Sequence, residues 1–367
     1  MNKIIYLDAA ATALKPQSVI SAESDFLQNK YANAGRGICP RAAAVDSMVS
    51  AARGHVAKFI GARDDNIVFT SGATDALNRV VNIIMRSRKN RPMRIAVSDL
   101  DHHSARMPWM VAAGTEIIVI PLNENFDIDI SQIPAADVIV ITAMSNVFGR
   151  PQNVGDIIRA ARKKNPNVIS IVDAAQYIAH LPINIGDWDC DFMCFSGHKI
   201  GSDTGIGVMY IKNPGDFSPD KFGGGMVNKI TDNNELIYNI APERFEAGTL
   251  PLTQIAGLPH AIDACRSWNC GGELIGHLYN QMLKIPRVNL LSAPGASLIT
   301  FTIDNMHVLD FGAIMGAHNV CLRVGNMCAT WAHRALGVSG SARISAGPWN
   351  TIDEMNTVAD IIKDVVK

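Results

Sequence analysis

In the stretch VISIVDAAQ, residues 168–176, a mostly apolar run ends on an acidic residue. Similar apolar runs recur along the chain, with helix-like segments between them. Runs that are apolar on both faces and alternate with helices predict a largely parallel sheet that is covered on both sides. The seven runs span residues 66–70, 93–97, 117–120, 138–141, 168–172, 192–195 and 208–211.

Polar residues directly follow several of these runs. In an open parallel sheet, ligands bind beyond the carboxyl ends of the strands. We therefore expect a binding site to gather around residues at these ends, namely Ser71, Asp99, Thr142, Asp173 and Ser196.

The pattern changes after residue 212. A passage rich in Gly, Pro and Asn, which includes residues 223–225, leads into a mixed α+β pattern that ends in a helix with an apolar face between Ile352 and Val365. The fold prediction is α/β: a large domain over residues 1–250 with a mostly parallel seven-stranded sheet, and a smaller α+β domain over residues 251–367. Whether the N-terminal segment packs on the small domain is left open.

The composition is that of an ordinary globular protein. The 367 residues are 48% hydrophobic and 18% charged, with a formal net charge of -1. Such a balance gives no electrostatic reason to expect nucleic acid or a membrane as a partner, so we expect a small-molecule substrate. We also expect a cytoplasmic location, because no signal sequence is recognisable. The seven scattered cysteines indicate reduced thiols rather than a disulfide framework.

The tetrapeptide Ser196-Gly197-His198-Lys199 follows an apolar run and precedes further glycines. Burial at a strand end lowers the pKa of a lysine, and this makes its amine nucleophilic toward an aldehyde. A surface lysine in a glycine-rich turn is the alternative reading of this motif.

Two further motifs lie at strand ends. A carboxylate at Asp173 can keep a pyridine nitrogen protonated, with Gln176 one turn away, although a simple helix N-cap explains the aspartate as well. Residues 71–75, Ser-Gly-Ala-Thr-Asp, can bind a phosphate at a helix N-terminus through backbone N–H groups and the Thr74 hydroxyl, or can merely cap the helix.

The order and spacing of these motifs together resemble the class V aminotransferases of fold type I, and most closely the SufS-like (group II) cysteine desulfurases. The resemblance extends over essentially the whole chain. The segments that carry it are residues 6–12, 31–33, 36–37, 67–70, 72–78, 101–104, 108–109, 145–149, 173–176, 196–199, 245–249, 328–329 and 343–345.

This resemblance implies the fold of type I pyridoxal-phosphate (PLP) transferases, with PLP held as a Schiff base on Lys199. It implies that His102 stacks on the ring and helps to move protons, that Asp173 pairs with the pyridine nitrogen and that Gln176 approaches the phenolic oxygen. The phosphate would be held by Ala73, Thr74, Ser196 and His198, and by Thr249 from the partner subunit of a homodimer. The substrate L-cysteine would be bound by Arg343, through a bidentate contact, by Asn146, which also belongs to the cofactor set, and by Ala10.

Cys328 matches the catalytic cysteine of the family. The resemblance implies that its thiolate attacks the sulfur of the substrate, leaving alanine and an enzyme persulfide that supplies a sulfur-acceptor protein, for iron–sulfur clusters or other sulfur compounds. A buried structural cysteine is the alternative. The short span between Cys328 and Arg343 resembles the group II enzymes, which have a compact cysteine loop.

The chain departs from the family pattern at three places. Asn326-Met327 stand where many members have two histidines, Met226 follows the glycines where an acidic residue is frequent, and Leu250 separates Thr249 from Pro251. These departures leave open the substrate preference, selenocysteine included, and the sulfur acceptor.

Three other interpretations remain open at this point. The chain can be a class V aminotransferase or lyase that acts on another amino acid, or a non-catalytic sulfur-relay protein that keeps the fold. The spacing of Cys190, Cys194 and His198 is compatible with a metal site, but the strand pattern of residues 191–195 disfavours it, and we expect none.

Overall fold

The seven apolar runs form one sheet in the computed structural model, which describes residues 3–35, 37–88, 91–268 and 271–367. Its strand order is β2-β8-β7-β6-β5-β3-β4. The strands are β2 (Ile67–Thr70), β3 (Met93–Ser98), β4 (Thr115–Ile120), β5 (Val138–Thr142), β6 (Ile169–Asp173), β7 (Phe192–Ser196) and β8 (Gly207–Ile211). The prediction of a mostly parallel seven-stranded sheet is confirmed, with β8 antiparallel to both of its neighbours.

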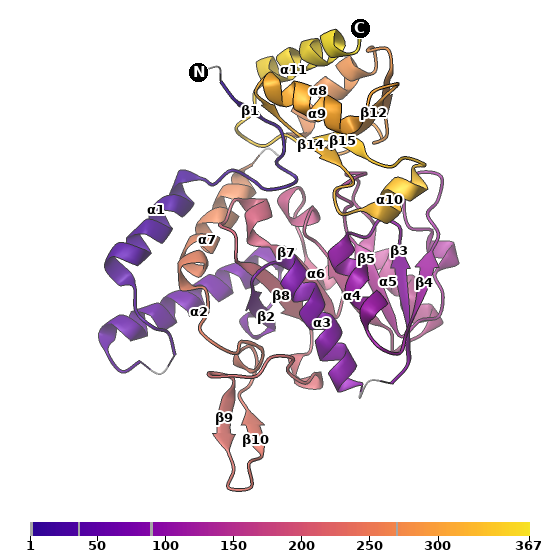
Figure 1. Ribbon diagram of the computed structural model, residues 1–367. Coiled ribbons are helices and arrows are strands. Elements are labelled where there is room, and N and C mark those ends of the chain that lie inside the picture. The colour runs from indigo at the N-terminus through magenta and orange to yellow at the C-terminus, as the bar shows by residue number, and fades with distance from the viewer. Residues whose placement is uncertain (1–2, 36, 89–90, 269–270) are drawn as a thin grey trace.

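Helices cover both faces of this sheet, because alternate residues of each strand enter two separate apolar cores. On one face lie α2 (Pro40–Ile60), α5 (Val154–Lys164), α6 (Ile185–Trp188) and α7 (Leu252–Ser267). On the other face lie α3 (Ala73–Ser87) and α4 (His103–Val111). Helix α1 (Gln17–Asp25) packs beside α7 (Figure 1). The sheet is thus covered on both sides, as its apolar strands require.

A smaller antiparallel sheet of order β11-β12-β15-β14 lies at the C-terminal end of the molecule (Figure 1). It consists of β11 (Val288–Leu290), β12 (Ile299–Ile303), β14 (Arg323–Gly325) and β15 (Ser341–Ile344). Around it pack α8 (Gly272–Met282), α9 (Val308–Ala317) and α11 (Ile352–Val365), while α10 (Thr330–Ala335) lies beside the larger sheet. The capping box of Thr351 and Glu354 begins α11, and Met355, Val358 and Ile362 form its buried face.

The N-terminal segment joins the smaller sheet region. Strand β1 (Ile5–Tyr6) pairs in parallel with β13 (Val320–Cys321), and Ile5 and Leu7 belong to the C-terminal apolar core. Helix α7, in contrast, packs against the core of the larger sheet. The division near residue 250 remains a proposal about the sequence, because α7 follows it but packs on the larger sheet, while Ile5 and Leu7 of the N-terminal segment pack on the small domain.

A hairpin of β9 (Val227–Ile230) and β10 (Leu236–Tyr238) projects from the body of the molecule (Figure 1). In the described part of the chain, no helix combines the length and the apolarity needed to cross a bilayer.

Candidate active site

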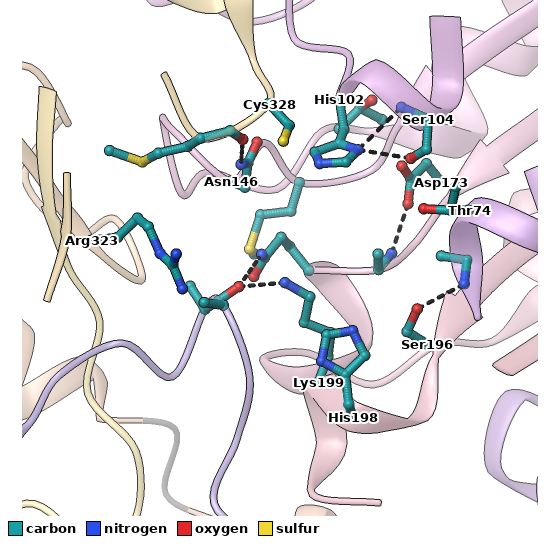
Figure 2. A pocket seen from close by; sticks show the side chains of 18 of the residues that line it. Thr74, His102, Ser104, Asn146, Asp173, Ser196, His198, Lys199, Arg323 and Cys328 are labelled. Atoms are coloured by element: carbon teal, nitrogen blue, oxygen red, sulfur yellow. Dashed lines mark hydrogen bonds between the residues drawn. The ribbon is translucent and has the colours of Figure 1, made fainter. Parts of the chain in front are cut away.

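A cavity of about 270 Å³ lies at the carboxyl ends of β5, β6 and β7, where the larger sheet faces the smaller one. It brings together the cofactor, substrate and catalytic residues implied by the family resemblance, except Thr249, while Ser71 and Asp99 among the strand-end residues lie outside its lining. The residues brought together are Ala10, Ala73, Thr74, His102, Asn146, Asp173, Gln176, Ser196, His198, Lys199, Cys328 and Arg343. Figure 2 shows that Lys199 and Cys328 reach the cavity from opposite sides.

Lys199 enters the cavity from the short turn that follows β7. Its amine donates a hydrogen bond to the carbonyl oxygen of Ala10, which also accepts one from the Gln176 amide at 2.7 Å. Burial, reinforced by the positive charge of Arg343, lowers the pKa of Lys199 to about 7. A substantial fraction of the amine is therefore neutral, and nucleophilic, near neutral pH.

Asp173 ends β6 and is only 4% exposed. One carboxylate oxygen accepts the backbone N–H of Ala175 at 2.9 Å, so the aspartate acts in part as the local turn cap that the sequence also allowed. Burial raises the pKa of Asp173, against the opposing effects of that hydrogen bond and of Lys199. Because a buried carboxylate is stable only when it is paired, Asp173 is suited to bind a cationic group that enters the cavity.

The N-terminus of α3 forms one end of the cavity. The Ser196 hydroxyl accepts the backbone N–H of Ala73 at 2.7 Å, and this bond ties the end of β7 to the helix. A Cβ at Gly207 would lie 2.5 Å from the Cα of Gly72, so only glycine lets β8 approach the helix start this closely. Thr74 and His198 line the cavity beside the α3 N-terminus. Burial lowers the pKa of His198 to about 4, so its imidazole is neutral. A helix N-terminus with neutral donors around it suits a phosphate.

Thr249 lies outside the cavity. It is exposed and lines a neighbouring surface hollow that shares Ser71, Asp75 and Gly205 with the hollow at the α3 N-terminus. Within one subunit it does not contribute to the cavity wall.

His102 is the N-cap of α4. Its Nδ1 accepts the backbone N–H of Ser104 at 3.2 Å and lies 2.7 Å from the Ser104 hydroxyl. Burial, together with the charge of Lys199, lowers the pKa of His102 to about 4. The imidazole is therefore neutral, with its proton on Nε2 because Nδ1 is an acceptor.

Arg343 reaches the cavity from β15. Its Nη1 donates to the carbonyl oxygen of Asn146 at 3.0 Å and its Nη2 donates to Asp8 Oδ1 at 3.1 Å, while the buried Nε has no partner among the described residues. Arg343 also lines the cavity, where its guanidinium retains donor capacity beyond these two bonds. The Asn146 Oδ1 atom is also buried, and the described part of the chain offers it no partner.

Arg323 is a cavity residue that the sequence motifs did not indicate. It lies on β14 directly opposite Arg343 in the ladder, and its Nη2 donates to Asp8 Oδ2 at 2.6 Å. Asp8 therefore joins two guanidinium groups. The signal for Arg323 is its register with Arg343, which the sequence alone does not reveal.

Cys328 is exposed at the loop between β14 and α10. Asn146 Nδ2 donates to the carbonyl oxygen of Met327 at 2.8 Å, and the backbone N–H of His103 donates to that of Cys328 at 2.9 Å. The structural alternative for this cysteine, a buried core position, does not apply. Cys190 and Cys194, in contrast, are fully buried, and among the described residues no three His, Cys, Asp or Glu side chains form a group that could hold a metal ion.

The donor set fits PLP. The cofactor needs an amine for its aldehyde, an anion for its pyridine nitrogen and hydrogen-bond donors for its phosphate. The cavity offers the partly neutral Lys199, the buried Asp173 and the N-terminus of α3 with Ser196 and His198.

The family is established by comparison with known proteins. Residues 5–358 match the model of the class-V aminotransferases, and the chain belongs to this family, whose cofactor is PLP. A cysteine desulfurase of Pectobacterium carotovorum is 33% identical over 96% of this chain and 91% of its own length. A probable cysteine desulfurase of Vibrio cholerae is 32% identical over 100% of this chain and 94% of its own length.

Solved structures agree with this assignment. The cysteine desulfurase of Thermococcus onnurineus superimposes with a TM-score of 0.93 at 27% identity, covering 100% of this chain and 95% of the other. The cysteine desulfurase CsdA of Escherichia coli superimposes with a TM-score of 0.90 at 29% identity, covering 98% of this chain and 94% of the other. The resemblance seen in the sequence is thus confirmed at the level of family and fold.

Proposed function

We propose that this chain is a PLP-dependent cysteine desulfurase, which converts L-cysteine to L-alanine and retains the sulfur as a persulfide on Cys328. The observation that carries the proposal is that Cys328 lines the same cavity as Lys199, Asp173 and Arg343. The full-length similarity to cysteine desulfurases supports it.

Lys199, Asp173 and His102 supply the chemistry on the cofactor side. PLP, when bound, acts as an electron sink for the α-carbon of an amino acid. Asp173 would hold the pyridine nitrogen, with Gln176 near the phenolic oxygen, and the α3 N-terminus with Thr74, Ser196 and His198 would hold the phosphate. The amine of Lys199, with its pKa lowered to about 7, can take up and return a proton, and neutral His102 presents Nε2 for a second proton transfer.

Arg343 and Asn146 would bind the substrate carboxylate. The guanidinium of Arg343, which lines the cavity, would make a bidentate contact to one carboxylate. The Asp8 carboxylate compensates part of the charge of Arg343 and Arg323, so the pair retains one net positive charge, which matches a single carboxylate. Ala10 also lines the cavity, where its carbonyl oxygen accepts hydrogen bonds from Lys199 and Gln176.

Cys328 would accept the sulfur. Its thiolate forms a sulfur–sulfur bond with the substrate thiol while the carbon–sulfur bond of the substrate breaks. The electron pair of that bond stays with the carbon skeleton, which takes up a proton and leaves as alanine, so no external oxidant is needed. A sulfur-acceptor protein would then collect the persulfide sulfur from the exposed loop, and a reducing, cytoplasmic compartment would keep the thiol free.

A homodimer would complete the phosphate site. Thr249 is exposed and lies outside the cavity of its own subunit, beside the hollow at the α3 N-terminus. The projecting hairpin and its surroundings expose the apolar side chains of Phe222, Ile230, Leu236, Ile237 and Ile240, which a partner subunit would cover. Light scattering on the purified protein, which should give twice the chain mass, tests this part of the proposal.

The decisive experiment measures alanine and sulfide release from L-cysteine with a reductant, using PLP-loaded wild type and Cys328→Ala. We expect both products from the wild type and little of either from the variant. If PLP is bound but neither protein acts on cysteine, the chain acts on another amino acid. If the purified protein does not bind PLP, a non-catalytic relay role replaces this proposal.

A further inference from the structure

The loop that carries Cys328 has a strained backbone. Met327 and Cys328 have φ angles of 55° and 54°, so two successive residues with side chains occupy the left-handed region. This region is unfavourable for residues other than glycine, and such a conformation persists only where neighbouring contacts enforce it.

Backbone hydrogen bonds supply part of that enforcement. The carbonyl groups of Met327 and Cys328 accept hydrogen bonds from Asn146 Nδ2 and from the backbone N–H of His103. The N–H of Ala329 donates to the carbonyl oxygen of Asn326 at 3.0 Å and closes the turn. The loop is therefore attached both to the segment after β5 and to the first residue of α4.

A chain of side chains adds a second attachment to α4. His103 Nε2 lies 2.9 Å from the Thr330 hydroxyl oxygen, and this hydroxyl donates to Asn326 Oδ1 at 3.1 Å. The backbone N–H of Thr330 also donates to His103 Nε2 at 3.4 Å, so His103 contacts both the backbone and the hydroxyl of Thr330. Two of these hydrogen-bonded residues flank Cys328 in the sequence, Asn326 before it and Thr330 after it.

Aromatic contacts support the same junction. The ring of Trp331 lies edge-on to His103 with 5.4 Å between centroids, and the Arg106 guanidinium lies 4.3 Å from the Trp331 centroid. Helix α10 is thereby held to α4, whose N-cap is His102. The positions of His102 and Cys328 are linked through a single helix end.

We propose that the hydrogen-bonded chain His103–Thr330–Asn326 positions Cys328 by holding its loop in the left-handed conformation, with the thiol directed toward the reacting sulfur. The loop geometry stands by itself, while its role in sulfur transfer rests on the proposed desulfurase function. Asn326 is one member of this hydrogen-bonded chain, and it stands where many group II cysteine desulfurases have a histidine. The set of hydrogen bonds therefore uses a residue in which this protein departs from the family pattern. His103, Thr330 and Asn326 are positioning residues, because they act on the reaction through Cys328.

The test is to break the hydrogen-bonded chain at its middle residue, Thr330, or at its Asn326 end, and to measure the reactivity of Cys328 in the PLP-loaded protein. Thr330→Val and Asn326→Ala each remove one hydrogen-bonding partner, and Thr330→Ser keeps the hydroxyl. The rate of iodoacetamide alkylation at Cys328 is measured by mass spectrometry relative to that at Cys39, which is exposed and far along the chain. Thr357→Val is the matched control, since within the described residues the Thr357 hydroxyl donates to the backbone carbonyl of Asp353 on α11, far from the Cys328 loop in sequence.

We expect Thr330→Val and Asn326→Ala to change the alkylation ratio by about threefold to tenfold, the effect of losing one net hydrogen bond. Alanine formation should fall in kcat by a similar factor, with KM for cysteine unchanged, because the carboxylate site is untouched. Thr330→Ser and Thr357→Val should behave as wild type. An unchanged alkylation ratio in both broken variants overturns the inference. A changed ratio in a protein whose wild type forms no alanine from cysteine instead supports the loop device and rejects the proposed function.

Discussion

The two walls of the cavity are built in different ways. One wall consists of residues at the ends of parallel strands, such as Asp173 on β6 and Ser196 on β7, which the hydrogen-bonded ladder fixes relative to each other. The opposite wall consists of Arg323 and Arg343 from the antiparallel sheet and Cys328 from a strained loop. Under the proposed function, the cofactor would be held mainly by one sheet, whereas substrate binding and sulfur transfer would depend on how two parts of the chain pack together.

The largest effect is expected on the strand-end wall, from Lys199→Ala. Loss of the amine removes both the covalent attachment of PLP and the proton transfers at the α-carbon, so activity should fall by about 10³-fold or more. The visible absorption of the purified protein should lose the band of the lysine-bound cofactor. Lys164→Ala, which removes an exposed lysine from the end of α5, is the control. An unaltered cofactor spectrum in Lys199→Ala contradicts the assignment of this wall.

On the opposite wall, Arg343→Ala should raise KM for cysteine by roughly tenfold to a hundredfold, because a charge-assisted contact to the substrate carboxylate is lost. Arg323→Ala should have a smaller effect, since its side chain is 47% exposed and that of Arg343 only 3%. Steady-state kinetics with cysteine decides between them. Equal KM values for the two variants would show that the difference in exposure does not rank the two arginines.

The smallest expected effect concerns the pKa of Lys199, which burial lowers to about 7. Only the neutral amine reacts with an aldehyde, so the rate at which the apoprotein recaptures PLP should rise with pH and level off above this pKa. Between roughly pH 6 and pH 8 the neutral fraction grows about tenfold. The rate is followed by the appearance of the visible band after the cofactor has been stripped. A rate that keeps rising toward pH 10 would mean that the amine has the pKa of an exposed lysine.

Much of the strand-end wall could be predicted from the sequence. Continuous apolar runs identified all seven strands, and the rule that ligands bind at carboxyl ends singled out Thr142, Asp173 and Ser196, all of which line the cavity. Asp99 follows the same rule but is engaged in an ion pair with Arg106, and Ser71 lines the adjacent hollow. Local pattern succeeds here because the position of each residue depends on its own strand.

Less of the opposite wall could be predicted. Resemblance to the family indicated Cys328 and Arg343, but no local pattern indicated Arg323 or the joining carboxylate of Asp8. Asp8 comes from the N-terminal segment and both arginines from the far end of the chain, so their meeting depends on contacts between segments that are distant in sequence. The residues that depart from the family pattern lie in different places. Asn326 accepts a hydrogen bond within the Cys328 loop, Met226 is buried, and Leu250 packs against the core of the larger sheet.

The sequence by itself determined the layered α/β architecture, the strand positions and the residues at the strand ends, because apolar periodicity and strand-end chemistry are local properties. The tertiary structure alone decided that β8 runs antiparallel, that Arg323 faces Arg343 across a ladder and that Met327 and Cys328 adopt left-handed backbone angles. Strand direction, register and strained loops are set by pairing and packing between distant segments, and hydrophobic pattern carries no information on these.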